Sequence, residues 1–189
     1  MGSFFKDMGH ILLMDNYILF PETENVKRLS AALGFSQINF KGKDFEIVLA
    51  SSQKELIQKA RQLKQKKSQV FFQPATEEML RFALEKVPID GVIGVENIHR
   101  SDSVHYIRGG LDQILCRIAQ ENEKIIVFSF SSILNSEQRP RLLRRMMFNL
   151  ELCQKFKVNT LFGNFSVAPE EMRSAADLQA FTRILRKSL

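Results

Sequence analysis

The chain has 189 residues and a net charge of +6, and its 44% hydrophobic and 25% charged residues are enough to bury a core without metal ions or disulfides. We expect neither a membrane span nor a secretory signal, because the apolar stretch Ile11–Phe20 is short and is interrupted by Asp15 and Asn16. Cys116 and Cys153 fall among apolar neighbours in helical patterns, as reduced cysteines do, so we expect a cytoplasmic protein that contacts no membrane.

Short apolar runs alternate with amphipathic patterns along the chain. The predicted strands, in chain order, are Ile11–Met14 or Tyr17–Phe20, which the sequence does not separate, Gln37–Phe40, Glu46–Ala50, Gln69–Phe72, Val92–Val95, Ile125–Phe130 and Asn159–Phe162. The predicted helices are Glu22–Leu33, Gln53–Lys64, Glu77–Lys86, Leu111–Gln120, Arg141–Lys155 and Ala175–Leu185. The last helix has a capping-box start, with Ser174 as N-cap and Asp177 three residues later.

This alternation of strands and helices predicts an α/β fold with a parallel sheet. Repeated right-handed crossovers lead either to a closed barrel or to an open doubly wound sheet. No GxGxxG motif follows the first strand, so the nucleotide-binding form of the open sheet loses its main support. No linker divides the chain either. We therefore predict one domain over residues 1–189, a TIM-barrel-like fold of about seven strands with outer helices.

The two cationic residue types are distributed unevenly. Ten of the thirteen arginines lie from Arg100 onward, whereas ten of the fourteen lysines lie before position 90. The planar guanidinium of arginine makes paired hydrogen bonds to phosphate oxygens and stacks on bases, which a lysine ammonium does not do. A nucleic acid is therefore the first partner to consider, although a basic net charge also describes many proteins that bind none.

Several cations follow predicted strands, and in such folds functional groups gather at the carboxyl ends of the strands. The RNA-binding candidates in these loops are Arg100, Arg108, Arg139, Arg173, Lys41 and Lys43. The pair Gly109 and Gly110, ahead of a predicted helix, could let phosphate approach the helix N-terminus, but a diglycine turn is a weak signal.

The helix Arg141–Lys155 combines an apolar stripe with a basic face. Its apolar stripe consists of Leu143, Met146, Met147, Leu150 and Cys153. The opposite face carries three further RNA-binding candidates, Arg141, Arg144 and Arg145, together with Phe148 and Leu152. A solvated face does not require these two apolar residues, so we predict a protein interface at Phe148 and Leu152, or stacking on bases. The alternative is a solvated basic face with two isolated apolar residues.

A catalytic metal site could be assembled from Asp15, Glu96, His99 and His105. The spacing does not favour it, because His99 and His105 lie six residues apart and form neither an H-x-H pair nor an i, i+4 pair. No G-x-S-x-G motif indicates a nucleophile either. We therefore predict no catalytic and no metal-binding residue, and we keep a free-standing metal-dependent phosphoesterase as the alternative.

Five blocks in a consistent order resemble one family. They are Ala32–Phe35, Asp90–Gly94, Gly110–Leu115, Val127–Ser131 and, most clearly, Met172–Leu178, which reads MRSAADL. They are similar to blocks of the archaeal ribonuclease P protein component 3 family, the counterpart of the eukaryotic 30-kDa subunit. The resemblance extends over nearly the whole chain.

The resemblance implies a seven-stranded barrel-like protein subunit on a catalytic RNA that removes the 5′ leader from precursor tRNA. It implies that the RNA and its magnesium ions perform the chemistry and that this chain binds no cofactor. The implied partners are ribonuclease P RNA, protein component 2 and the other protein subunits. The barrel is also similar to polymerase-and-histidinol-phosphatase phosphoesterases, but residues Leu12–Asn16 lack the H-x-H ligands of their first strand.

Overall fold

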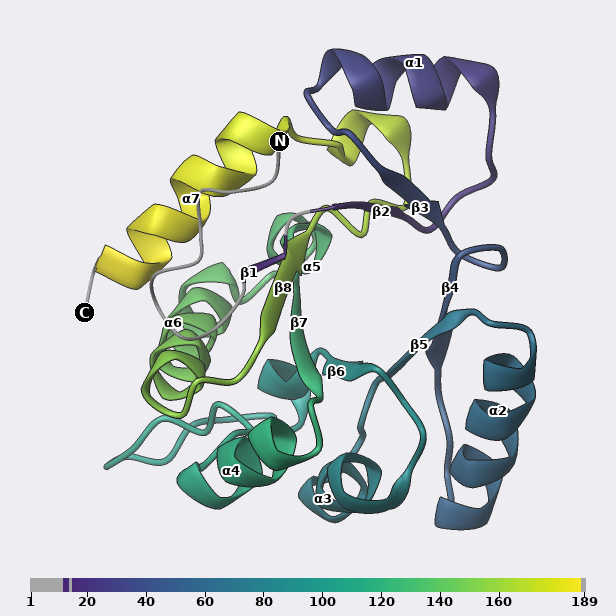
Figure 1. The fold of residues 1–189 in the computed structure, drawn as a ribbon. Helices are drawn as coiled ribbons and strands as arrows, with labels where there is room; N and C mark the ends of the chain where they lie inside the picture. The colour runs from purple at the N-terminus through teal and green to yellow at the C-terminus, as the bar shows by residue number, and fades with distance from the viewer. Residues whose placement is uncertain (1–11, 14, 188–189) are drawn as a thin grey trace.

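The computed structural model describes residues 12–13 and 15–187, and in this part strands and helices alternate (Figure 1). The strands are β1 Leu12–Leu13, β2 Asn16–Ile18, β3 Ile38–Phe40, β4 Phe45–Val48, β5 Gln69–Phe72, β6 Gly91–Ile93, β7 Ile125–Ser129 and β8 Thr160–Gly163. The helices are α1 Glu24–Ala32, α2 Gln53–Gln65, α3 Glu77–Lys86, η1 Val95–Asn97, α4 Gln113–Glu121, α5 Phe130–Leu134, α6 Arg139–Lys155, η2 Pro169–Glu171 and α7 Ala175–Lys187.

All strand pairs are parallel. Six strands form one sheet in the order β1-β8-β7-β6-β5-β4, and β2 and β3 form a second sheet. Isolated bridges between Ile18 and Ser166 and between Lys41 and Phe45 link the small sheet to the end of β8 and to the start of β4. The predicted α/β class with a parallel sheet is confirmed. Within the described residues, no helix has both the length and the apolar character needed to cross a bilayer.

The two faces of the large sheet are packed differently. Successive strand residues point to opposite faces, so Phe72 contacts the core beneath the helices while Phe71 points to the inner side. There Phe71 joins an aromatic cluster in which the rings of Tyr17 and Phe165 stack at 4.9 Å. Figure 1 shows α2, α3, α4 and α6 on the outer side of the strands. Burial on both faces explains why these strands are continuous apolar runs.

The predicted elements are present, with shifts that have local causes. Both alternatives for the first strand exist, as β1 and β2, although residues 11 and 14 lie outside the described part. The strand predicted to reach Phe130 ends at Ser129, because the Ser129 hydroxyl caps the unpredicted helix α5 by accepting the Ser132 N–H at 3.2 Å. Asp112 caps α4 by accepting the Leu115 N–H at 2.7 Å, so this helix begins at Gln113. The predicted cap of α7 is confirmed, since Ser174 accepts the Asp177 N–H.

Candidate nucleic-acid interface

The longest connection after a strand runs from β6 to α4, and its part between η1 and α4, the 98–112 segment, lies against α6 (Figure 1). Arg100 and Arg108 of this segment are exposed, as is Arg144 of α6, while Arg141 is half-buried. Arg144 lies close enough to the segment to lower the pKa of its Asp102. We refer to the exposed arginines of α6 and of the segment that covers it, Arg100, Arg108 and Arg144, as the basic surface around α6.

Arg145 is not part of this surface, and its predicted RNA-binding role is wrong. Its side chain is only 2% exposed. Its Nε donates to Asp102 Oδ1 at 2.8 Å, and its Nη1 donates to the carbonyl oxygens of Glu96 at 2.8 Å and His99 at 2.7 Å. The prediction failed because α6 is buried on two sides, by the sheet and by the 98–112 segment. Arg145 fixes that segment to the helix.

The buried side of α6 is also wider than the predicted stripe. Leu142 and Asn149 are buried in addition to Met146, Leu150 and Cys153, while Leu143 and Met147 are half-buried against the core. The Asn149 Nδ2 donates to Gly109 O at 2.7 Å. Like Arg145, Asn149 holds the 98–112 segment on the helix.

The pKa values of the two acidic residues beside Arg145, Asp102 and Glu96, are shifted in opposite directions. Burial acts to raise the pKa of Asp102, but hydrogen bonds from the Arg108 N–H and from Arg145 outweigh it, and the pKa is lowered. Glu96 is completely buried, and neither of its carboxylate oxygens has a hydrogen-bond partner among the described residues. Burial raises its pKa to about 7, although its own amide and Arg145 oppose the rise.

The residues considered for a metal site do not form one in the part of the chain that the structure describes. No group of three or more histidine, cysteine, aspartate or glutamate side chains there could hold an ion. The His99 Nε2 instead bonds to Glu77 Oε1 at 2.7 Å. Glu96 is enclosed beside Arg145, and His105 is exposed.

Gly109 and Gly110 allow close packing of the 98–112 segment, a role that the sequence analysis did not predict. A Cβ atom on Gly109 would lie 2.4 Å from Asn149 Oδ1. Gly110 has a φ of +89°, and a Cβ atom there would lie 2.1 Å from the Val95 carbonyl oxygen. The diglycine therefore permits the close approach of the segment to α6 and η1.

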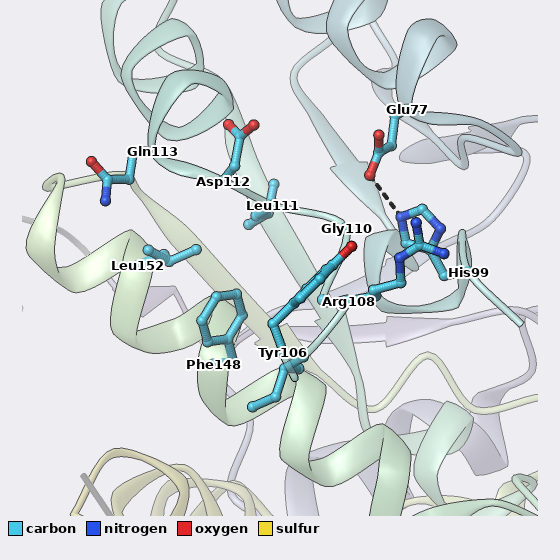
Figure 2. A pocket seen from close by; sticks show the side chains of 12 residues that line it. Glu77, His99, Tyr106, Arg108, Gly110, Leu111, Asp112, Gln113, Phe148 and Leu152 are labelled. Atoms are coloured by element: carbon cyan, nitrogen blue, oxygen red, sulfur yellow. Dashed lines mark hydrogen bonds and ion pairs between the residues drawn. The ribbon is translucent and has the colours of Figure 1, made fainter. Parts of the chain in front are cut away.

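Phe148 and Leu152 are half-buried rather than on an open face. They line a pocket of about 510 Å³ between α6 and the end of the 98–112 segment. Figure 2 shows both side chains projecting from α6 toward the segment that carries Tyr106 and Leu111. The sequence reasoning missed Tyr106 in this pocket, although a lone aromatic residue between His105 and Arg108 in a polar loop was a usable signal.

Two further candidates contact α5. The Arg139 Nη2 donates to Leu134 O at 2.7 Å, and Arg139 remains exposed. The Arg173 guanidinium lies 5.9 Å from the centre of the Phe130 ring. Arg139 is the first residue of α6 rather than a loop residue.

Lys41 and Lys43 lie in the turn between β3 and β4 and are exposed, with Lys43 Nζ 2.7 Å from Glu22 Oε2. Figure 1 places this turn on the opposite side of the molecule from the 98–112 segment. The structure thus separates the remaining candidates into a group around α6, the pair at α5 and these two lysines.

The Met172–Leu178 block begins at a network of buried amides. The Asn164 side chain accepts the Arg173 N–H at 2.9 Å and donates to Arg173 O at 3.0 Å and to Asn16 Oδ1 at 2.9 Å. The Asn16 Nδ2 donates to Ser30 Oγ at 2.8 Å. Asn164 thus joins the connection after β8 to β2 and α1.

Replacing Asn164 by alanine should therefore lower the free energy of unfolding by about 2 kcal/mol, since it leaves buried polar groups without partners. Asn122→Ala is the matched control, because Asn122 is exposed and its Nδ2 donates to the Ile118 carbonyl oxygen one turn earlier. It should cost less than about 0.5 kcal/mol. Urea denaturation of both variants measures the difference, and equal losses would contradict the role given to Asn164.

The chain is similar to known proteins in sequence and in fold. No protein-family model matches it. Ribonuclease P protein component 3 of Methanocaldococcus jannaschii is 25% identical over 144 residues, which are 75% of this chain and 59% of that protein. The chain thus spans less than two thirds of the length of this relative. This finding and the first of the structural similarities below confirm the resemblance predicted from the sequence blocks.

Two solved structures share the fold. A chain in the cryo-EM structure of archaeal ribonuclease P with mature tRNA superposes with a TM-score of 0.68 at 20% identity, covering 93% of this chain and 83% of that one. The crystal structure of an uncharacterized protein superposes with a TM-score of 0.51 at 12% identity, covering 96% and 52%.

Proposed function

We propose that this chain is a protein subunit of ribonuclease P, the ribonucleoprotein that removes the 5′ leader from precursor tRNA. The observation that carries the proposal is the similarity to component 3 of this enzyme over 75% of the chain. The structural similarity to a chain of the archaeal ribonuclease P complex supports it. In this role the RNA and its magnesium ions perform the cleavage, and the polypeptide binds the RNA and protein component 2.

The proposed fold is a barrel of seven strands. The bridges Ile18 to Ser166 and Lys41 to Phe45 support it, because they connect the β2–β3 sheet to the chain that follows β8 and to the edge strand β4 at the other end of the large sheet. In such a ring β1 and β2 count as one interrupted strand. The carboxyl ends of the strands then meet on one side, from which the 98–112 segment and α5 emerge.

The basic surface around α6 supports RNA as a direct partner. Arg100, Arg108 and Arg144 are exposed there, and arginines in such a position contact phosphates without reading sequence. The alternative of a free-standing metal-dependent phosphoesterase has no group of metal ligands in the described residues to support it.

Reconstituted cleavage of precursor tRNA tests the proposal. Ribonuclease P RNA and component 2 are combined with and without this chain at limiting magnesium, and we expect the chain to raise the cleavage rate. An unchanged rate would overturn the proposal. Addition of manganese or zinc to the chain alone tests the phosphoesterase alternative, which requires activity on generic phosphoesters.

Contacts to phosphate also make the RNA affinity depend on salt. Binding releases counterions, so the logarithm of the association constant should fall linearly with the logarithm of the salt concentration. Arg144→Ala should make this slope shallower by roughly one. Arg61→Ala on α2 is the control, because Arg61 is exposed on another helix and should leave the slope unchanged. Filter binding between low and moderate salt measures both, and a salt-independent affinity would count against phosphate contacts.

A further inference from the structure

The pocket between α6 and the end of the 98–112 segment has the composition of a site for a single RNA base. We propose that it binds one unstacked base, with the neighbouring phosphates at its rim. This inference rests on the proposed function and identifies what one part of the surface recognises. Its lining includes Tyr106, Arg108, Phe148, Leu152, Glu77 and Asp112.

The walls of the pocket suit a flat, aromatic group. Its volume of about 510 Å³ falls within the roughly 300–1,000 Å³ typical of small-ligand sites. Phe148 and Leu152 supply apolar surface from α6, and the Tyr106 ring, which is 59% exposed, supplies it from the segment (Figure 2). Unpaired bases are bound in this way, by stacking on aromatic side chains.

The charges are arranged for a base inside and phosphates outside. Glu77 and Asp112 line the pocket, so a phosphate inside it would meet two carboxylates. Two exposed cations lie beside these walls: Arg108 lines the pocket with its guanidinium carbon 6.0 Å from the centre of the Tyr106 ring, and Arg144, outside the lining, lies one helical turn before Phe148. Arginines so placed can contact the phosphates on either side of a bound base.

The polar groups of the lining indicate which bases fit. Glu77 uses Oε1 for His99, and Asp112 uses Oδ1 for the Leu115 N–H, so each carboxylate has a second oxygen to accept a hydrogen bond. An exocyclic amino group, which adenine, cytosine and guanine carry, has two N–H donors and can serve both carboxylates, whereas uracil has the single N3–H donor and can serve one. We therefore expect a preference of about five-fold for these bases over uracil, the equivalent of one hydrogen bond.

Binding of short single-stranded RNA by the full-length chain tests the site. Fluorescence anisotropy compares labelled oligomers of A, C and U with wild type, Tyr106→Ala and Phe148→Ala. Each of the two variants should bind RNA roughly ten-fold more weakly than wild type, which is the effect of losing the stacking of one base. Val104→Ala is the matched control, because Val104 lies in the same segment, is 95% exposed and does not line the pocket. It should change the affinity less than two-fold.

Three outcomes would overturn the site. They are unchanged affinity in both pocket variants, equal binding of all oligomers, and no measurable binding at millimolar RNA. Should the variants bind RNA normally but lose component 2, the pocket holds a protein side chain and the inference is also wrong. Tyr106→Ala keeps the test valid if Phe148→Ala does not fold, since Tyr106 is largely exposed. The wild-type cleavage assay fails or succeeds independently, so it separates this inference from the proposed function.

Discussion

Replacing Arg145 by alanine should lower the free energy of unfolding by about 3 kcal/mol, the lower end of what breaking a buried ion pair costs. The guanidinium is 2% exposed and bonds to Asp102 and to the carbonyl oxygens of Glu96 and His99. Its removal leaves both carbonyls without this partner and leaves the Asp102 carboxylate with the Arg108 N–H but without its cation. Because the Asp102 side chain is 19% exposed and can regain water, the loss should stay near the lower end. Urea denaturation at neutral pH measures it.

Arg144→Ala is the control for this prediction. Arg144 is the neighbouring residue on the same helix and has the same side chain, but it is exposed. Its loss should change the stability by less than about 0.5 kcal/mol. Arg144→Ala should nevertheless weaken RNA binding, since it removes a cation from the basic surface while the protein stays folded. Equal destabilisation by the two substitutions would show that Arg145 does not anchor the segment.

Elements that depend on local pattern could be predicted from the sequence. Helix α3 has the predicted bounds, Glu77–Lys86, because its N-cap and its apolar periodicity agree. Helix α5 was missed because Phe130–Leu134 continues the apolar run of β7, and only the cap at Ser129 separates the two elements. Periodicity does not distinguish a strand from a short buried helix in such a run.

The site was predicted less well because it depends on contacts between distant residues. Arg145 and Asp102 are 43 positions apart, and nothing in the helical pattern shows that the 98–112 segment folds over this side of α6. From sequence alone, a helix face that carries charged residues is predicted to be exposed to solvent. A charged side chain can nevertheless be buried where it has several hydrogen-bond partners. Phe148 and Leu152 were singled out from the sequence as apolar residues beside arginines, but the pocket that they line is completed by the 98–112 segment, which the helical pattern does not reveal.

Glu96→Gln should change the dependence of stability on pH. Burial raises the pKa of Glu96 from 4.5 to about 7 in the folded chain. Between these values the folded chain holds a proton that the unfolded chain has lost, so wild-type stability should fall as the pH rises from about 4.5 to 7 and then level off. At about 1.4 kcal/mol per pKa unit, the loss approaches roughly 3 kcal/mol. Glutamine stays neutral, so the variant should be more stable than wild type at pH 8 and similar to it near pH 4.5.

The effect of Glu96 on the pH dependence of stability can be separated from that of Asp102, because Asp102 makes the fold less stable as the pH falls, whereas Glu96 makes it less stable as the pH rises. The pKa of Asp102 is lowered in the folded chain, so Asp102 stabilises the fold above about pH 4 and loses this contribution as the pH falls further. Wild type should thus be most stable in mildly acid solution, whereas Glu96→Gln should keep the acid loss and show no decline toward pH 8. Glu151→Gln, at an exposed position of α6, should reproduce the wild-type profile. The urea concentration at the unfolding midpoint, measured between pH 3 and 8, tests these profiles. If the midpoint depends on pH in the same way in wild type and Glu96→Gln, Glu96 is not held in its neutral form.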